Sequence, residues 1–265
     1  MKRFSFDLAI SCAAGIFTCL IVFPILALFT VTPLGELIGQ FKSPLIWSAI
    51  LVSLETSLAV VFLALCLGIP VAYLLATRKF RGKEIIDTLI DLPIVLPPLV
   101  AGLALLIFLG GNSPAGRFLS RNGLDLVFSK KGIIMAQLFV SAPFLIKSSR
   151  QAFESINENI LKASSTLGAS KFYTFRNVSL PLAKNGIYAG MVMTWARALG
   201  EFGATSMVAG CIPWKTQTMT IAIYMNALSG KSSASIAIAL LLTIFSFTSL
   251  LIFKSRAMGQ MNRRW

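Results

Sequence analysis

Two ionisable residues, Arg197 and Glu201, lie inside a long apolar segment of the sequence. A charged side chain in the middle of a membrane costs about 2.5–3.5 kcal/mol on insertion scales, so such residues are functional-site candidates by default. The two residues are one helical turn apart, which allows their opposite charges to neutralise each other. Thr194 lies three residues before Arg197, and Thr205 lies four residues after Glu201. The pattern predicts a polar stripe on one face of an apolar helix, directed toward protein or water and away from lipid.

The longest polar run between two membrane-length apolar segments begins at Ile156. Ile156, Ile160, Ala163 and Leu167 recur at steps of four, three and four residues, which predicts an apolar face on a helix too short to cross a membrane. Gly168 can end that helix, because glycine accepts the left-handed conformation that follows many helix C-termini. The pattern alone is consistent both with a helix that lies on the lipid surface and with one that docks on a partner protein.

The composition of the whole chain is that of an integral membrane protein. Apolar residues make up 56% of the 265 residues, charged residues make up 13%, and the mean hydropathy is +0.79. Globular domains carry about 25% charged residues. The net charge of +14 is dispersed over short segments between apolar runs instead of forming one basic patch, which argues against a nucleic-acid-binding protein.

The residue types that catalysis and metal binding require are scarce. The chain has no histidine, which removes the commonest general base. None of its four cysteines stands in a paired metal-ligand spacing, and the glycines at 110–111 lack the lysine of a phosphate-binding loop. We therefore expect no catalytic residue, metal site or cofactor in this chain, and any energy for its work must come from elsewhere.

Six segments are long and apolar enough to cross a bilayer core of about 30 Å, which takes roughly 20 helical residues. The first is too long for the apolar core of a signal peptide. Pro93, Pro97 and Pro98 should break or kink the third. We expect one transmembrane domain over residues 1–265 with a cytoplasmic loop at about 150–185. The predicted spans are residues 8–31, 49–76, 89–109, 132–146, 187–211 and 235–253.

The distribution of lysine and arginine predicts the orientation of these spans. Both termini, the segment 78–83 and the segment 147–184 fall on one side and hold sixteen basic residues, against seven on the other side. Because cytoplasmic loops carry the excess of basic residues, we place both termini in the cytoplasm of a multi-pass protein of the plasma membrane. The polar run Lys215–Thr218 is then expected to be an exposed loop on the outer side.

The run KASSTLGASKFYTFRNVSLPLAKNGI resembles the cytoplasmic loop signature of ABC importer permeases. That signature has a glutamate and two alanines, then three residues, a glycine, and later an apolar-x-leucine-proline element. Lysine replaces the glutamate here, and serine replaces the second alanine. The matching positions are Lys162, Ala163, Ser164, Gly168, Val178, Leu180 and Pro181. The resemblance implies a coupling helix that sits in a cleft of an ATP-binding subunit, through Ile156, Ile160, Ala163, Ser164, Leu167, Gly168, Leu180 and Pro181.

A second run, from Trp195 to Tyr224, is similar to permeases for tetrahedral oxyanions. Its elements ALGEFGAT, IP and TQT are most like the molybdate/tungstate branch, and sulfate permeases are also similar. The resemblance implies molybdate or tungstate as the transported ion, with sulfate next.

The polar stripe then has two interpretations. In one, Thr194, Arg197, Glu201 and Thr205 line the translocation path, and Arg197 partly balances the charge of the anion. In the other, Arg197 and Glu201 form a structural ion pair that locks the helix, with Glu55 as a further candidate member. We favour the ion pair, because a transporter must release its anion and a strong unpaired cation would hold it.

We therefore expect an all-α polytopic membrane protein of about six transmembrane helices, like the permeases of type I ABC importers. The resemblance implies a homodimer with its path at the subunit interface, two ATP-binding cassette subunits that use ATP and Mg²⁺, and an extracytoplasmic substrate-binding protein. The alternative is a self-sufficient secondary anion transporter or channel. The missing histidines and the presence of only two deep carboxylates, Glu55 and Glu201, argue against it.

Overall fold

Every regular element in the described part of the chain, residues 2–31 and 33–261 of the computed structural model, is a helix. The predicted all-α polytopic fold is thereby confirmed. The helices are α1 (Lys2–Thr30), α2 (Leu34–Gln40), α3 (Pro44–Thr77), α4 (Lys83–Val95), α5 (Pro98–Leu109), α6 (Pro114–Arg121), α7 (Lys130–Glu154), α8 (Glu158–Thr166), α9 (Lys171–Thr174), the π-helical turn η1 (Phe175–Ser179), α10 (Leu180–Leu199), α11 (Gly203–Ala209), α12 (Met219–Leu228) and α13 (Ser232–Met261).

Four of these helices are each long and apolar enough to cross a membrane, namely α1, α3, α7 and α13. The bent pair α4 and α5 supplies a fifth crossing if the two halves are taken together. Helix α10 is 20 residues long but carries Lys184 and Arg197, and it is not among them. Four to five apolar helices are roughly consistent with the six predicted spans.

Two of the predicted spans are interrupted. The third bends by 114° between α4 and α5, where Pro97 and Pro98 supply no backbone N–H to continue the helix. This bend confirms the break predicted from the prolines. The fifth is divided at Gly200–Phe202 into α10 and α11, a break that the apolar pattern of residues 187–211 conceals.

Helices α3, α7 and α10 pack together at the centre of the fold. The approach of α10 to α7 is close because glycine occupies the contact: a Cβ at Gly186 would lie 2.4 Å from Ala152 Cβ, and one at Gly190 would lie 2.9 Å from Leu145 Cα. Small residues let transmembrane helices approach to backbone distance and gain packing contacts. The α7–α10 pair is therefore a tightly interlocked unit.

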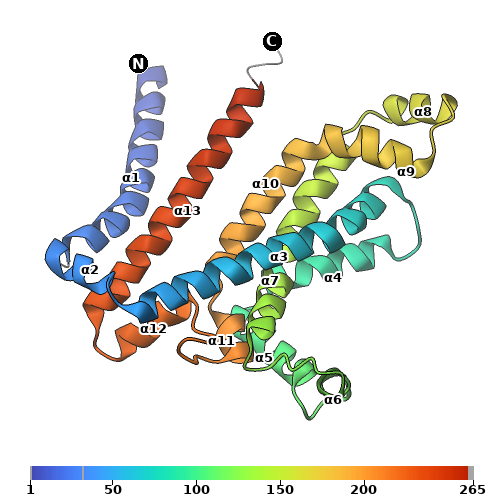
Figure 1. Ribbon diagram of the computed structural model, residues 1–265. Coiled ribbons are helices and arrows are strands. Elements are labelled where there is room, and N and C mark those ends of the chain that lie inside the picture. Colours follow the sequence, from blue (N-terminus) through green and yellow to red (C-terminus); the bar gives the residue numbers. More distant parts are fainter. Residues whose placement is uncertain (1, 32, 262–265) are drawn as a thin grey trace.

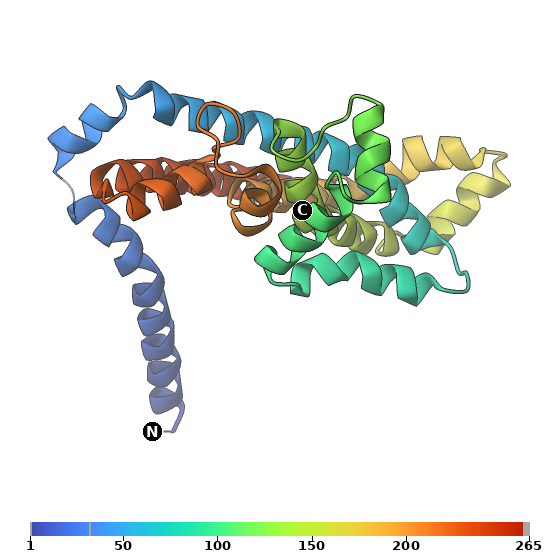
Figure 2. The same cartoon turned by 90° about the horizontal axis from the view of Figure 1, so that it is seen from below.

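The two ends of the molecule carry different elements (Figure 1). The start of α1, the end of α13, and the α8–α9 segment lie at one end, which we call the α8 end, whereas α2, α6, α11 and α12 lie toward the other. Figure 2 shows α1 standing away from the rest of the helices. Its side chains are exposed along nearly the whole of residues 10–31.

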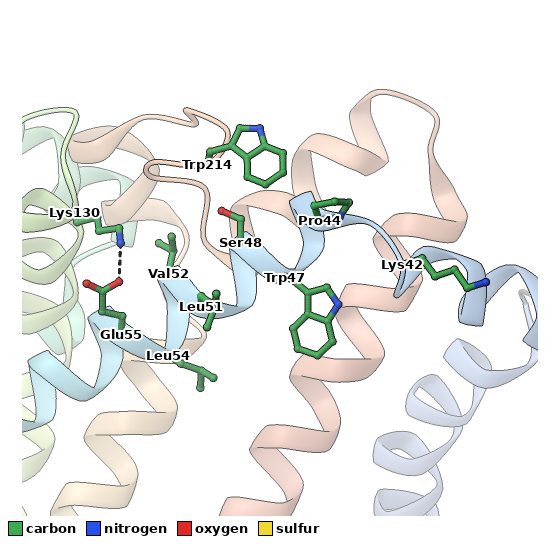
Figure 3. A pocket seen from close by; sticks show the side chains of 10 residues that line it. All are labelled: Lys42, Pro44, Trp47, Ser48, Leu51, Val52, Leu54, Glu55, Lys130 and Trp214. Carbon is green, nitrogen blue, oxygen red and sulfur yellow. Dashed lines mark hydrogen bonds and ion pairs between the residues drawn. The ribbon is translucent and has the colours of Figure 1, made fainter.

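The charges along α3 indicate where the membrane boundaries lie. Residues 56–77 carry no charge over 22 positions, a length of about 33 Å in a helix and close to the thickness of the hydrocarbon core. Glu55 precedes this stretch and pairs with Lys130 at 2.6 Å. Trp47 and Trp214 line the same open groove as this ion pair (Figure 3), as expected where a helix enters the interfacial zone.

Candidate functional site

The polar run between α7 and α10 forms a segment that projects from the α8 end of the molecule (Figure 1). The Asn159 N–H donates to Asn157 Oδ1 at 2.9 Å, which caps the start of α8. Beyond the end of the helix Gly168 takes a φ of +79°, a conformation that favours glycine. The predicted helix stop at Gly168 is confirmed.

Helix α8 presents an uncovered apolar face. None of its residues is buried. Ile160 and Ala163 are exposed, and Leu167 directly after the helix is 87% exposed. Ile156 lies ahead of α8 and packs, half-buried, against the cluster formed by α3, α7 and α10. The exposed face is therefore shorter than the pattern predicts, and Ile156 anchors the segment instead of joining that face.

Polar contacts hold α8 against the segment that follows it. The hydroxyls of Ser164 and Thr174 are 2.8 Å apart, and Thr174 is buried. Lys162, at the position where the family signature has an acid, pairs with Glu158 at 3.1 Å, and both side chains are exposed. An exposed pair of this kind contributes little stability. Ser164 thus hydrogen-bonds α8 to α9, while the side chain of Lys162 lies on the surface.

After the turn at residues 167–170, one continuous helical rod leads from α9 to α10. Helix α9 runs into the π-helical turn η1, which runs into α10, so that Leu180 and Pro181 form the first turn of α10. The ring of Phe175 in this rod lies 4.6 Å from that of Tyr73 on α3, and Tyr73 contacts Phe153 on α7 at 5.3 Å. Aromatic side chains therefore pack the rod against α3 and α7 at the point where it leads into α10.

At the other end of α10, the carboxylate of Glu201 organises the break before α11. The side chain of Glu201 is 1% exposed. Its Oε2 lies 2.6 Å from Arg197 Nη1, and its Oε1 accepts the Ala204 N–H at 2.8 Å. Thr220 Oγ1 donates to the Glu201 carbonyl at 2.9 Å. One carboxylate thus joins the last turn of α10 to the first turn of α11.

The structure places the rest of the predicted polar stripe inside the subunit. Thr194 is buried and donates to the Ser141 carbonyl of α7 at 3.1 Å, and Thr205 is also buried. Arg197 alone reaches the surface, with 30% of its side chain exposed. The suggestion that Glu55 joins this pair is wrong, because Glu55 contacts Lys130 at the start of α7.

The two helix breaks lie against each other. A Cβ at Gly203 in α11 would fall 2.8 Å from Pro98 Cβ, and one at Gly102 in α5 would fall 2.7 Å from Ala204 Cα. In membrane proteins, irregular backbone at membrane depth is tolerated where protein or a water-filled cavity surrounds it. The paired breaks are the candidate site for a movement that opens or closes a path, because each break can change angle without unwinding a full helix.

The polar run before α12 is exposed at Lys215, as expected, but not at the three residues that follow. Thr216, Gln217 and Thr218 are all buried. The Ile212 N–H donates to Thr216 Oγ1 at 3.1 Å, and Thr218 caps α12 through the N–H of Ile221. Their uncharged hydroxyl and amide side chains, which can be hydrogen-bonded inside a protein, are the only signal in the sequence that could have indicated this burial.

Three comparisons of sequence place the chain among transport proteins. Residues 64–256 match the family described as the binding-protein-dependent transport system inner membrane component. The chain is 37% identical over 242 residues to the molybdate/tungstate transport system permease protein WtpB of Pyrococcus abyssi, covering 89% of this chain and 92% of that protein. It is 36% identical over 220 residues to the molybdenum transport system permease protein ModB of Escherichia coli K12, covering 80% and 96%.

The chain is also similar to a sulfate permease and to chains of two solved transporter structures. The probable sulfate transport system permease protein cysT of Anthoceros angustus is 30% identical over 263 residues, covering 99% of this chain and 91% of that protein. A chain of a bacterial alginate ABC transporter superposes with a TM-score of 0.74 at 20% identity, covering 99% and 96%. A chain of the MetNI methionine ABC transporter gives 0.66 at 17% identity, covering 81% and 95%. At these identities the structural likeness bears on the fold alone.

Proposed function

The chain belongs to the binding-protein-dependent transport system inner membrane component family, and from that premise we propose that it is the membrane-spanning subunit of an ATP-driven importer for a tetrahedral oxyanion. Molybdate or tungstate is the proposed ion, and sulfate is the next candidate. The observation that carries this proposal is the similarity to molybdate and tungstate permeases over most of both chains. The chain is a multi-pass membrane protein and a transport component, and the hydrolysis of ATP is assigned to a partner subunit.

The uncovered apolar face of α8 supports the proposed contact with that partner. Ile160, Ala163 and Leu167 offer apolar surface at the tip of the molecule, where no other described helix covers it. We assign this face, in each copy of the chain, to a cleft in one of two ATP-binding cassette subunits. Closure of those subunits on ATP would draw the two α8 segments together, and the rod from α9 to α10 would pass the movement to the break beside Glu201.

A homodimer is the proposed assembly, with the path between its two subunits. Helix α1 exposes nearly all of its apolar side chains between Ile10 and Val31 and stands away from the other helices (Figure 2). Helix α5 also exposes large apolar residues, including Ile107 and Phe108. A second copy and the surrounding lipid would share the covering of these surfaces. An extracytoplasmic binding protein would deliver the oxyanion at the end of the molecule opposite α8.

Competition for uptake distinguishes among the proposed ions. In vesicles that hold the assembled complex, we expect unlabelled tungstate to suppress the uptake of labelled molybdate at near-equal concentration. Sulfate should require at least about a tenfold excess, since its smaller size loses optimal contact and a tenfold difference corresponds to 1.4 kcal/mol. Stronger suppression by sulfate than by tungstate would reassign the chain to sulfate transport, and a lack of suppression by either ion would remove the oxyanion proposal.

The proposed orientation, with both termini and α8 in the cytoplasm, is tested by labelling α6. Ser120 is an exposed residue of α6, the helix that lies toward the end opposite α8 (Figure 1). In a chain without its native cysteines, Ser120→Cys is expected to react with a membrane-impermeant thiol reagent on intact cells. The matched variant Ser165→Cys on the exposed surface of α8 should react only after the membrane is breached. The reverse pattern would invert the topology.

A further inference from the structure

The turn between α3 and α4 concentrates positive charge at one membrane boundary. Helix α3 ends at Thr77, and Gly82 takes a φ of +86°, which lets the chain reverse direction before α4 begins. Four of the six residues from 78 to 83 are basic, namely Arg78, Lys79, Arg81 and Lys83. We call this segment the basic turn. It follows directly after the 22 uncharged residues of α3 that match the hydrocarbon thickness.

The charges of the basic turn are not neutralised within the subunit. Among the described residues, the four basic side chains make no ion pair, and Glu84 is the nearest acid in sequence. Two basic residues of α7 are paired instead: Lys147 lies 2.7 Å from Asp91, and Arg150 contacts both Asp87 and Glu154. The basic turn therefore presents a positive charge that no ion pair compensates, unlike Lys147 and Arg150.

Apolar side chains flank this charge. Phe80 is 36% exposed in the middle of the turn, and Ile85 in the first turn of α4 is 67% exposed. These two residues line an open cavity of about 400 Å³ together with Lys79, Gly82, Lys83 and Glu84, so that two basic side chains face one acidic one there. The volume is able to take a lipid headgroup. A water-soluble protein partner would not require an apolar wall that continues into the exposed apolar face of α4. A phospholipid has both an anionic group and chains that meet such a wall.

We propose that the basic turn binds the headgroup of an anionic phospholipid, with the lipid chains lying along Phe80, Ile85 and the exposed face of α4. Basic residues at a membrane surface attract anionic lipid, and each favours it by about fivefold at physiological ionic strength. Orientation of the chain requires only that basic residues flank a span. The unpaired charges, the cavity and the apolar wall are additional features, and they hold on whichever side of the membrane the turn lies.

The test measures which lipids stay on the full-length protein. Protein purified in detergent is exchanged into mixed micelles with equal phosphatidylglycerol and phosphatidylcholine, and the retained lipids are counted by mass spectrometry of the intact protein. The turn variant carries Arg78→Gln, Lys79→Gln, Arg81→Gln and Lys83→Gln. The matched control removes four exposed charges at the same end of the molecule, through Lys162→Gln, Lys171→Gln, Arg176→Gln and Lys184→Gln.

The turn variant is expected to lose its preference for phosphatidylglycerol by at least tenfold, while the control, whose four charges do not line that cavity, loses less than about fivefold, the effect of one surface charge. The charge-preserving pair Arg78→Lys and Arg81→Lys should keep the preference. If the fourfold variant does not fold, the two halves, Arg78→Gln with Lys79→Gln and Arg81→Gln with Lys83→Gln, should each lose part of it. An unchanged preference, or an equal loss in the control, would overturn the proposal.

A protein contact at the basic turn is distinguished by a parallel co-purification of the same variants with the ATPase subunit. If the turn variant retains the lipid preference but no longer co-purifies with the ATPase subunit, the basic turn is a contact for that subunit and the lipid proposal fails. The measurement does not involve transport, so its result is independent of the proposed function.

Discussion

Replacing Glu201 by alanine is expected to destabilise the protein by about 1–3 kcal/mol and to abolish transport, because the buried Ala204 N–H is left without its acceptor and the partly exposed Arg197 without its counter-ion. Arg197 would lose its counter-ion at 2.6 Å, and the Ala204 N–H would lose its acceptor at the start of α11. Both losses fall on the break that joins α10 to α11. Thermal unfolding of the purified chain in detergent measures the destabilisation.

Two further variants separate the ion pair from the helix cap. Glu201→Gln keeps an oxygen for the Ala204 N–H and should therefore lose less stability than Glu201→Ala. The double variant Arg197→Ala/Glu201→Ala should recover part of the loss of either single variant, because no buried charge remains unpaired. Recovery should be incomplete, since Ala204 still lacks its acceptor. A double variant no more stable than either single one would contradict the structural pairing.

Replacing Leu167 by aspartate is expected to reduce transport at least about tenfold while the chain itself remains folded. Leu167 is 87% exposed at the end of α8, so its replacement removes no contact within the subunit. Burying a leucine side chain in a partner contributes about 1.5–3 kcal/mol, and a carboxylate at that position would oppose docking. Uptake and ATP hydrolysis by the reconstituted complex, measured in parallel, should show hydrolysis uncoupled from transport.

The matched control for Leu167→Asp is Lys162→Glu, which restores the acid of the family signature on the same helix. Lys162 lies on the surface, where its pair with Glu158 contributes little. Its replacement should therefore uncouple the complex less than Leu167→Asp does. The opposite ranking would show that charge at position 162, and not the apolar face of α8, determines docking.

Hydrophobic length and proline chemistry account for what the sequence could predict of the fold. Long apolar segments predicted where α1, α3, α7 and α13 lie, because membrane thickness sets the length of a spanning helix, but the predicted ends differ from the helix ends by up to eight residues. Pro97 and Pro98 predicted the bend between α4 and α5. The second break, at Gly200–Phe202, was not predicted. The Glu201 side chain accepts the Ala204 N–H, and Thr220, 19 residues further along, donates to the Glu201 carbonyl. Neither bond can be foreseen from the apolar pattern of the segment.

Helical periodicity was less informative about the side chains of the candidate sites. The four-residue spacing of Arg197 and Glu201 predicted their pair, which the structure contains. The same spacing could not foresee that Thr194 and Thr205 are buried, since burial depends on α7 packing against α10 and on α5 and α7 packing against α11. Ile156 matched the apolar spacing of α8 but lies outside that helix, because periodicity carries no information about where a turn begins.

Contacts between segments that are far apart in the sequence could not be predicted from the spacing of apolar and polar residues. Glu55 was placed with Arg197 only because both lie deep in apolar segments, yet it pairs with Lys130 across 75 positions. The buried state of Thr216–Thr218 likewise depends on α3, where Ser53 accepts the N–H of Met219 at 2.7 Å. Such contacts are set by tertiary packing and are absent from any local window of sequence.

The most direct test of the proposed function is molybdate uptake into vesicles that contain this chain, an ATPase subunit and a binding protein. Uptake should require ATP inside the cytoplasmic compartment and the binding protein outside, and it should persist when ionophores collapse the ion gradients. Depletion of ATP with the gradients intact should stop it. Uptake that continues without ATP and follows an ion gradient would contradict the ATP-driven importer and identify a secondary transporter.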